Sequence, residues 1–137
     1  MRVVVDTNVF FASFFGGPPR NIVDLWKTGE ITLCLTRQIM DEYVRVLLEA
    51  GCGRDTEIHD LLGLFRIGHH AVFSARTKAI QVCRDSDDDK FIEAAVALEA
   101  SVIVSGDKHL LEIEEYAGIE ILRPREFLNR FFPQALE

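Results

Sequence analysis

The segment RDSDDDKF, residues 84–91, places four aspartates within five positions, directly before the apolar run FIEAAVALEA. Two of these acids could serve a helix start, because Ser86 and Asp89 have the spacing of a capping box and first-turn carboxylates meet the helix dipole favourably. Neither effect accounts for all four, since neighbouring like charges repel and raise each other's pKa. The cluster is therefore a candidate cation site. Its acids are Asp85, Asp87, Asp88 and Asp89.

Two more acids follow apolar runs that are typical of buried strands. Asp6 comes directly after VVV, and Asp107 follows VIVSG. Taken singly, either could be a helix cap or a solvated charge. The carboxyl ends of parallel strands meet at one edge of a sheet, however, and uncompensated carboxylates within about 4–6 Å are costly. A hard cation such as Mg²⁺ or Mn²⁺ removes that cost, which would suit the site to phosphodiester hydrolysis.

Alternating strands and helices must position these acids, which predicts an α/β fold with a mainly parallel sheet covered on both faces. Strands are predicted at 2–5, 31–35, 71–73, 102–105 and 119–122. Helices are predicted at 10–15, 18–29, from the Thr36 cap to Gly51, at 56–68 with an interruption at Gly63, from the acidic cluster to about Ala100, at 108–118, and after Pro124.

The composition fits one soluble domain spanning residues 1–137, with 48% hydrophobic and 27% charged residues. No stretch is long and apolar enough for a membrane span, and the N-terminus does not resemble a secretory signal, so we expect a cytoplasmic protein. The net charge of −7 argues against a protein that only binds nucleic acid. An enzyme that contacts the phosphate of its substrate through a bound metal can be acidic.

The cysteines are odd in number and form no C-x-x-C pair, which argues against a disulfide framework or a zinc site. Cys34 and Cys83 lie in apolar runs and are expected to be small buried hydrophobes. The third is Cys52.

Four motifs in this order resemble the PIN-domain family, and most closely its VapC-like toxin branch: VVVDTNVF, LTRQIMDEYVRVL, CRDSDDDKFIEAAVALEASVIVSGDKHLL and IEILRPREFL. The resemblance implies a three-layer α/β/α sandwich. It also implies a Mg²⁺- or Mn²⁺-dependent ribonuclease that cuts RNA and is made with a cognate antitoxin.

The resemblance further implies which residues form the site. The catalytic acids fall on Asp6, Glu42, Asp88 and Asp107, and these four, with Asp89 as the close alternative to Asp88, are the expected metal ligands. Residues expected to orient them are Thr7, Asn8, Ser105 and Asp85. By pattern alone, Glu42 lies at the edge of its helix's apolar arc and would be a solvated residue.

Substrate backbone must be held by basic side chains despite the net charge. Lys90 and Lys108 are the preferred candidates because they adjoin the acids. Other candidates, each more typical of an ordinary solvated residue, are Arg20, Arg37, Arg45, Arg76, Lys78 and Arg84. The run FFASFF, with four phenylalanines in six positions, suits either core packing or a surface for a homodimer, a higher oligomer or the antitoxin.

Three other functions remain to be weighed. A PIN-like module could bind RNA or protein without cutting, although all four acidic positions are filled here. A haloacid-dehalogenase-like metal-dependent phosphatase would want a second acid where Asn8 stands. A receiver-like domain would need a phosphoacceptor aspartate after the strand at 31–35, and that stretch offers none.

Overall fold

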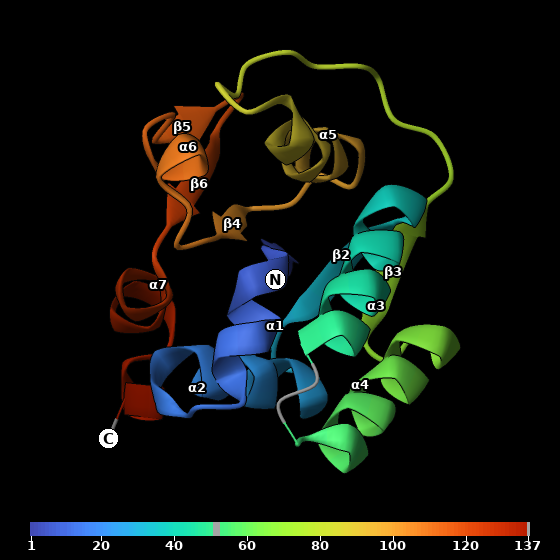
Figure 1. Cartoon of the computed structure of the whole chain (residues 1–137). Helices are drawn as coiled ribbons and strands as arrows, with labels where there is room; N and C mark the ends of the chain where they lie inside the picture. Colours follow the sequence, from blue (N-terminus) through green and yellow to red (C-terminus); the bar gives the residue numbers. More distant parts are fainter. Residues whose placement is uncertain (51–52, 137) are drawn as a thin grey trace.

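Six strands form one sheet in the computed structural model, which describes residues 1–50 and 53–136 (Figure 1). Their order across the sheet is β3-β2-β1-β4-β6-β5, and every neighbouring pair is parallel except β5 with β6. The strands are β1 Arg2–Val5, β2 Thr32–Thr36, β3 Ala71–Ser74, β4 Val102–Val104, β5 Glu115–Tyr116 and β6 Ile119–Leu122. The predicted mainly parallel sheet is confirmed.

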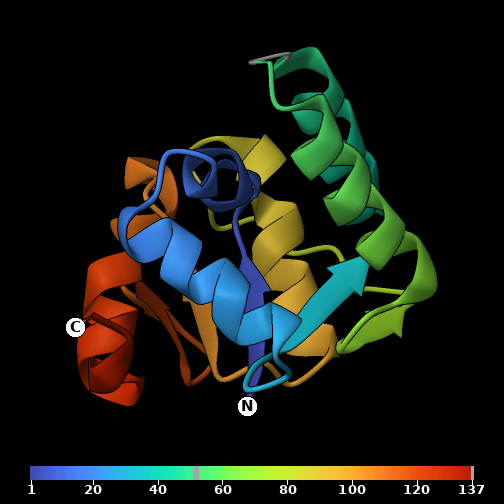
Figure 2. The same ribbon diagram turned by 90° about the horizontal axis from the view of Figure 1, so that it is seen from below.

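Helices lie on both faces of the sheet. Figures 1 and 2 show α2 and α5 on opposite sides of β1, as the predicted α/β/α sandwich requires. The helices are α1 Thr7–Ser13, α2 Gly17–Lys27, α3 Arg37–Ala50, α4 Asp55–Ile67, α5 Asp89–Ala97, α6 Lys108–Leu111 and α7 Pro124–Phe131, with short 3₁₀ turns at Ser86–Asp88 and Pro133–Leu136. Within the described residues, none of these helices has the length and apolarity needed to cross a bilayer.

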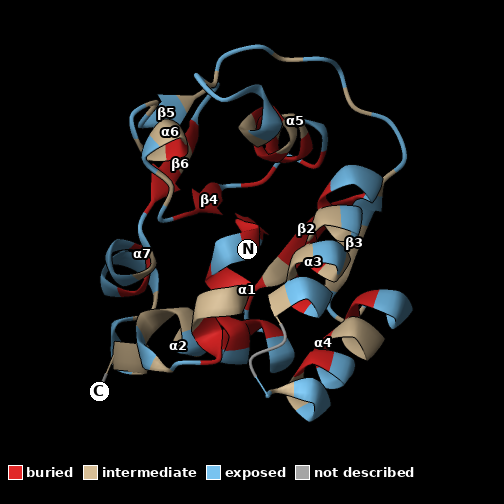
Figure 3. Cartoon of the chain, in the orientation of Figure 1, coloured by how far each residue is buried: buried red, intermediate tan, exposed pale blue. Residues whose placement is uncertain are grey.

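The hydrophobic core is built around the two central strands, β1 and β4, whose valines and isoleucine are at most 1% exposed (Figure 3). Beside them, the ring of Phe10 meets Trp26, Tyr43 and Phe65 edge-on, with ring centroids 4.8–5.5 Å apart. The FFASFF run therefore divides between the two alternatives, because Phe10 is buried in this aromatic cluster whereas Phe15 is 64% exposed.

The predicted helix over 108–118 is wrong. Only its first turn is helical, and the chain then forms an antiparallel hairpin of β5 with β6. Glu114, Ala117 and Gly118 all adopt positive φ, which a right-handed helix cannot accommodate. The apolar spacing of this segment fits either structure, and pairing with the sheet decides between them.

Other boundaries differ for local reasons. The first helix begins at Thr7 instead of residue 10, because Asp6 caps it by accepting a hydrogen bond from the Asn8 amide. Gly63 does not interrupt α4, and the helix after the acidic cluster ends at Ala97 instead of about Ala100.

Cys34 is buried as predicted, but Cys83 is only half-buried because it lies in the long connection between β3 and α5. Both are free thiols. Cys52 and the predicted helix end at Gly51 lie outside the described residues.

Candidate metal centre

The carboxylate of Asp6 is held where the two central strands end side by side. Val5 of β1 pairs with Val104 of β4, and the Asp6 amide continues this ladder by donating to the Val104 carbonyl at 2.9 Å. The Asp6 side chain is buried and accepts hydrogen bonds from the Ser105 hydroxyl, at 2.6 Å, and from the Asn8 amide, at 3.3 Å. Asp6 is therefore both a strand-end acid and a helix cap.

Ser105 connects Asp6 to the next acid. Its oxygen accepts a hydrogen bond from the Asp107 amide at 2.9 Å while its hydroxyl donates to Asp6. The Asp107 carboxylate in turn accepts from the His109 amide at 2.7 Å. Burial raises the pKa of Asp6, and the negative charges of Asp107 and Glu42 raise it further, against the lowering effect of the hydrogen bonds. The predicted meeting of Asp6 and Asp107 at one sheet edge is thus observed.

Asp88 is the acid of the cluster whose pKa responds to the charges of this pair. Its Oδ2 atom is buried without a hydrogen-bond partner. Burial raises the pKa of Asp88 to about 6, and the charges of Asp107, Asp6 and Asp85 act in the same direction, whereas Lys90 lowers it. A buried carboxylate oxygen without a donor is unusual, because such groups are normally paired.

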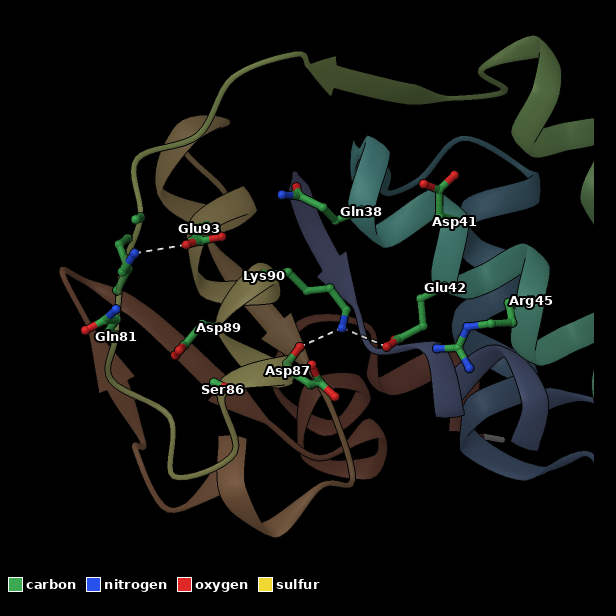
Figure 4. Close-up of a pocket in the computed structure, with 12 residues that line it drawn as sticks. Gln38, Asp41, Glu42, Arg45, Gln81, Ser86, Asp87, Asp89, Lys90 and Glu93 are labelled. Atoms are coloured by element: carbon green, nitrogen blue, oxygen red, sulfur yellow. Dashed lines mark hydrogen bonds and ion pairs between the residues drawn. The ribbon is translucent and has the colours of Figure 1, made fainter.

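Asp89 turns the other way. One of its oxygens accepts hydrogen bonds from the amides of Val82, at 3.1 Å, and Cys83, at 2.8 Å. Figure 4 shows its side chain on the opposite side of the helix start from Lys90. Although burial alone would raise the pKa of Asp89, these hydrogen bonds lower it. Its carboxylate therefore anchors the preceding loop, and we leave it out of the proposed ligand set.

The capping box expected from Ser86 and Asp89 does not form, because Asp89 is occupied by the loop. Asp85 starts the short 3₁₀ turn instead, by accepting from the Asp87 amide at 3.0 Å. Asp85 is exposed, so it contributes charge to the neighbourhood of Asp88 from the surface.

Glu42 reaches the same region from α3. The adjacent Tyr43 is buried, and its hydroxyl donates to the Val5 carbonyl, which ties α3 to the end of β1. The Thr7 hydroxyl donates to one oxygen of Glu42, and the Lys90 ammonium lies 2.7 Å from the other (Figure 4). Both oxygens of Glu42 are therefore engaged.

The remaining predicted residues are placed less centrally. Asn8 acts through its backbone amide, and its side chain is exposed, as is that of Lys108. Arg45 and Arg84 pair with surface glutamates. Tyr43, directly after Glu42, is a positioning residue that the sequence prediction did not name, because its hydroxyl donates to the Val5 carbonyl and so fixes this helix against β1.

The carboxylate oxygens of Asp6, Asp88 and Asp107 suit a hard divalent ion, which takes oxygen ligands. The unpartnered Asp88 oxygen is the clearest sign of such a fit. Among the described side chains, no three His, Cys, Asp or Glu residues already stand close enough together to enclose a metal. Binding would therefore require movements that bring the carboxylates of Asp6, Asp88 and Asp107 closer together.

A family model described as PIN domain matches residues 2–109, which include β1, β4 and all the acids discussed. The chain belongs to the PIN-domain family. It is also similar to an uncharacterized protein, MJ1680, of Methanocaldococcus jannaschii. The two are 30% identical over an alignment of 145 positions, which covers 96% of this chain and 92% of that protein. Membership supports a nuclease-type hydrolase and argues against the phosphatase and receiver alternatives.

Proposed function

We propose that this PIN domain is a divalent-metal-dependent endoribonuclease that acts in the cytoplasm as the toxin of a toxin–antitoxin pair. The observation that supports it most is the Asp88 carboxylate. Its Oδ2 atom is buried without a donor, and burial, together with the charges of Asp107 and Asp6, raises its pKa. A folded protein tolerates such a cluster best when a cation neutralises it.

Asp6, Asp88 and Asp107 would hold Mg²⁺ or Mn²⁺, which supplies a more acidic water and stabilises charge on the phosphate. Ser105 keeps two of these acids in position through its paired hydrogen bonds. Glu42 holds the Lys90 ammonium at the rim, where it can meet a phosphate oxygen of the substrate.

The reaction is hydrolysis, so its atoms balance without a further reactant. The oxygen of a water molecule forms a bond to phosphorus, the bond from phosphorus to one bridging oxygen breaks, and that oxygen leaves with a proton. No protein nucleophile is required, which agrees with a site composed of carboxylates.

The direct test incubates purified protein with mixed RNA and Mn²⁺ or Mg²⁺. We expect cleavage that stops with a chelator, and a loss of about 100-fold or more in Asp6→Asn, because this variant loses a proposed ligand of the metal that would stabilise charge on the phosphate. Asp24→Asn is the matched control, since Asp24 is an exposed aspartate on α2 that pairs only loosely with Arg20. Cleavage that survives both chelator and Asp6→Asn would reject the metal mechanism, and RNA binding without any cleavage would favour the non-catalytic module.

Ser105→Ala tests the support beneath the acids. We expect Mn²⁺ affinity to fall about tenfold, as is usual when a residue that orients a ligand is lost. The pKa of Asp6 should rise further, because the Ser105 hydrogen bond is the strongest of the effects that lower it. Titration calorimetry and carboxyl NMR measure the two quantities, and unchanged values for both would exclude this role.

The toxin assignment needs a protein partner and a cellular effect. Large apolar side chains at Ile67, Phe73 and Leu48 are more than half exposed, which supports a protein partner or a homodimer. Expression of the chain without its antitoxin is expected to arrest growth, and Asp6→Asn is expected to relieve the arrest. Arrest by both forms would remove the support for a catalytic toxin.

A further inference from the structure

The ion pair between Lys90 and Glu42 differs from the other pairs in the described chain. Its side chains are only 16% and 19% exposed, whereas every other lysine or arginine pair with a carboxylate has both partners at least 39% exposed. The Lys90 ammonium also donates to the Asp87 carbonyl at 2.6 Å (Figure 4). The ammonium is therefore held at a defined point between α5 and α3.

Removing one member of such a pair would be costly, because a half-buried charge would lose its partner. Glu42 cannot easily turn away, since the Thr7 hydroxyl holds its other oxygen. Thr7 follows Asp6 directly, so the pair is attached to the same strand end that carries the first acid. The ammonium is in this way a permanent part of the acidic site.

Two-metal phosphodiester hydrolases place two cations about 3.5–4 Å apart, so that both the attacking and the leaving oxygen meet positive charge. We propose that the Lys90 ammonium occupies the place of a second divalent ion, so that this site takes a single Mg²⁺ or Mn²⁺. The inference rests on the proposed metal-dependent function and adds the number of ions and the identity of the second cation.

Charge and space support this assignment. Asp6, Asp88, Asp107 and Glu42 carry four negative charges, and one divalent ion together with one ammonium would offset three of them. Lys90 and Glu42 also line an open hollow of about 600 Å³ between α3 and α5, which can admit a substrate phosphate.

The experiment counts Mn²⁺ ions bound by metal-free protein in the absence of RNA. Titration calorimetry gives the stoichiometry, and electron paramagnetic resonance detects two ions that lie a few ångströms apart. The variants are Lys90→Gln, which removes the charge, Lys90→Arg, which keeps it, and Lys27→Gln, a control at an exposed lysine on α2. Mn²⁺-dependent cleavage rates are measured on the same preparations.

We expect one Mn²⁺ in the wild type, in Lys90→Arg and in Lys27→Gln, and two coupled ions in Lys90→Gln because Glu42 is released. Two ions in the wild type, or one ion bound with unchanged affinity in Lys90→Gln, would overturn the inference while leaving the proposed function intact. The wild-type count decides the matter even if Lys90→Gln does not fold. A wild type that binds no Mn²⁺ and does not cleave RNA would reject the proposed function and this inference together.

Discussion

Replacing Asp88 by asparagine is expected to abolish RNA cleavage and, at the same time, to stabilise the metal-free protein. The buried Oδ2 atom has no donor, and burial and the charges of Asp107 and Asp6 disfavour the ionised carboxylate. Removing the charge relieves that repulsion, so the free energy of unfolding should rise by about 1 kcal/mol after allowance for solvent screening. Cleavage should fall about 100-fold or more, because a proposed metal ligand is lost.

Asp89→Asn is the matched control, since it is the same substitution one residue away. Its carboxylate accepts two backbone amides, and bonds to a charged acceptor are about twice as strong as neutral ones. We expect this variant to lose about 1–2 kcal/mol of stability and to keep far more activity than Asp88→Asn. Urea unfolding of chelator-treated protein measures the free energy of unfolding of both variants. Stability changes of the same sign would show that the two carboxylates do not differ in role.

The pH dependence has a definite sign. The pKa of Asp88 is raised to about 6 in the folded protein from 3.8, so the folded state binds its proton more tightly than the unfolded state does. The carboxyl therefore costs no stability below about pH 4, and its cost grows as the pH rises towards 6 and then stays constant. The advantage of metal-free Asp88→Asn over the wild type should accordingly be larger at pH 7.5 than at pH 4.5. Equal advantages would contradict the assignment.

Phe10→Ala is expected to destabilise the protein by about 3–5 kcal/mol, as is typical of a buried phenylalanine whose removal leaves a cavity. The Phe10 ring is 1% exposed and contacts Trp26, Tyr43 and Phe65. A loss of this size is a large part of the 5–15 kcal/mol that usually stabilises a domain. It would also loosen α1, whose first turn is capped by Asp6. Thermal and urea unfolding measure the effect.

Phe15→Ala is the control from the same FFASFF run. Its ring is 64% exposed and meets only the ring of Phe11 among the described aromatic pairs, at 5.5 Å between centroids. We expect a change within about 0.5 kcal/mol, the usual range for a surface substitution. Similar losses in Phe10→Ala and Phe15→Ala would mean that this run does not divide between core and surface.

Much of the fold could be predicted because the relevant signals are local. Apolar runs such as VVV and VIV identify buried parallel strands, and the residue after each run must lie at the carboxyl edge of the sheet. This reasoning places Asp6 at that edge and Asp107 close beyond it, after Ser105 and Gly106. The hairpin of β5 with β6 is not predictable in the same way, because a short apolar segment fits a helix or a strand and only its neighbour in the sheet selects one.

The sequence does not show which of Asp88 and Asp89 anchors the preceding loop and which is available as a metal ligand. Adjacent residues at a helix start point about 100° apart, so which one faces the acids depends on where the rest of the chain lies. The amides of Val82 and Cys83 donate hydrogen bonds to Asp89, which leaves Asp88 as the acid whose pKa is raised by burial and by the charges of Asp107 and Asp6. The pairing of Lys90 with Glu42 likewise arises only when α5 packs beside α3. The sequence by itself determined which acids reach the sheet edge, and the tertiary structure decided which of them face one another, because side-chain direction depends on contacts between distant segments.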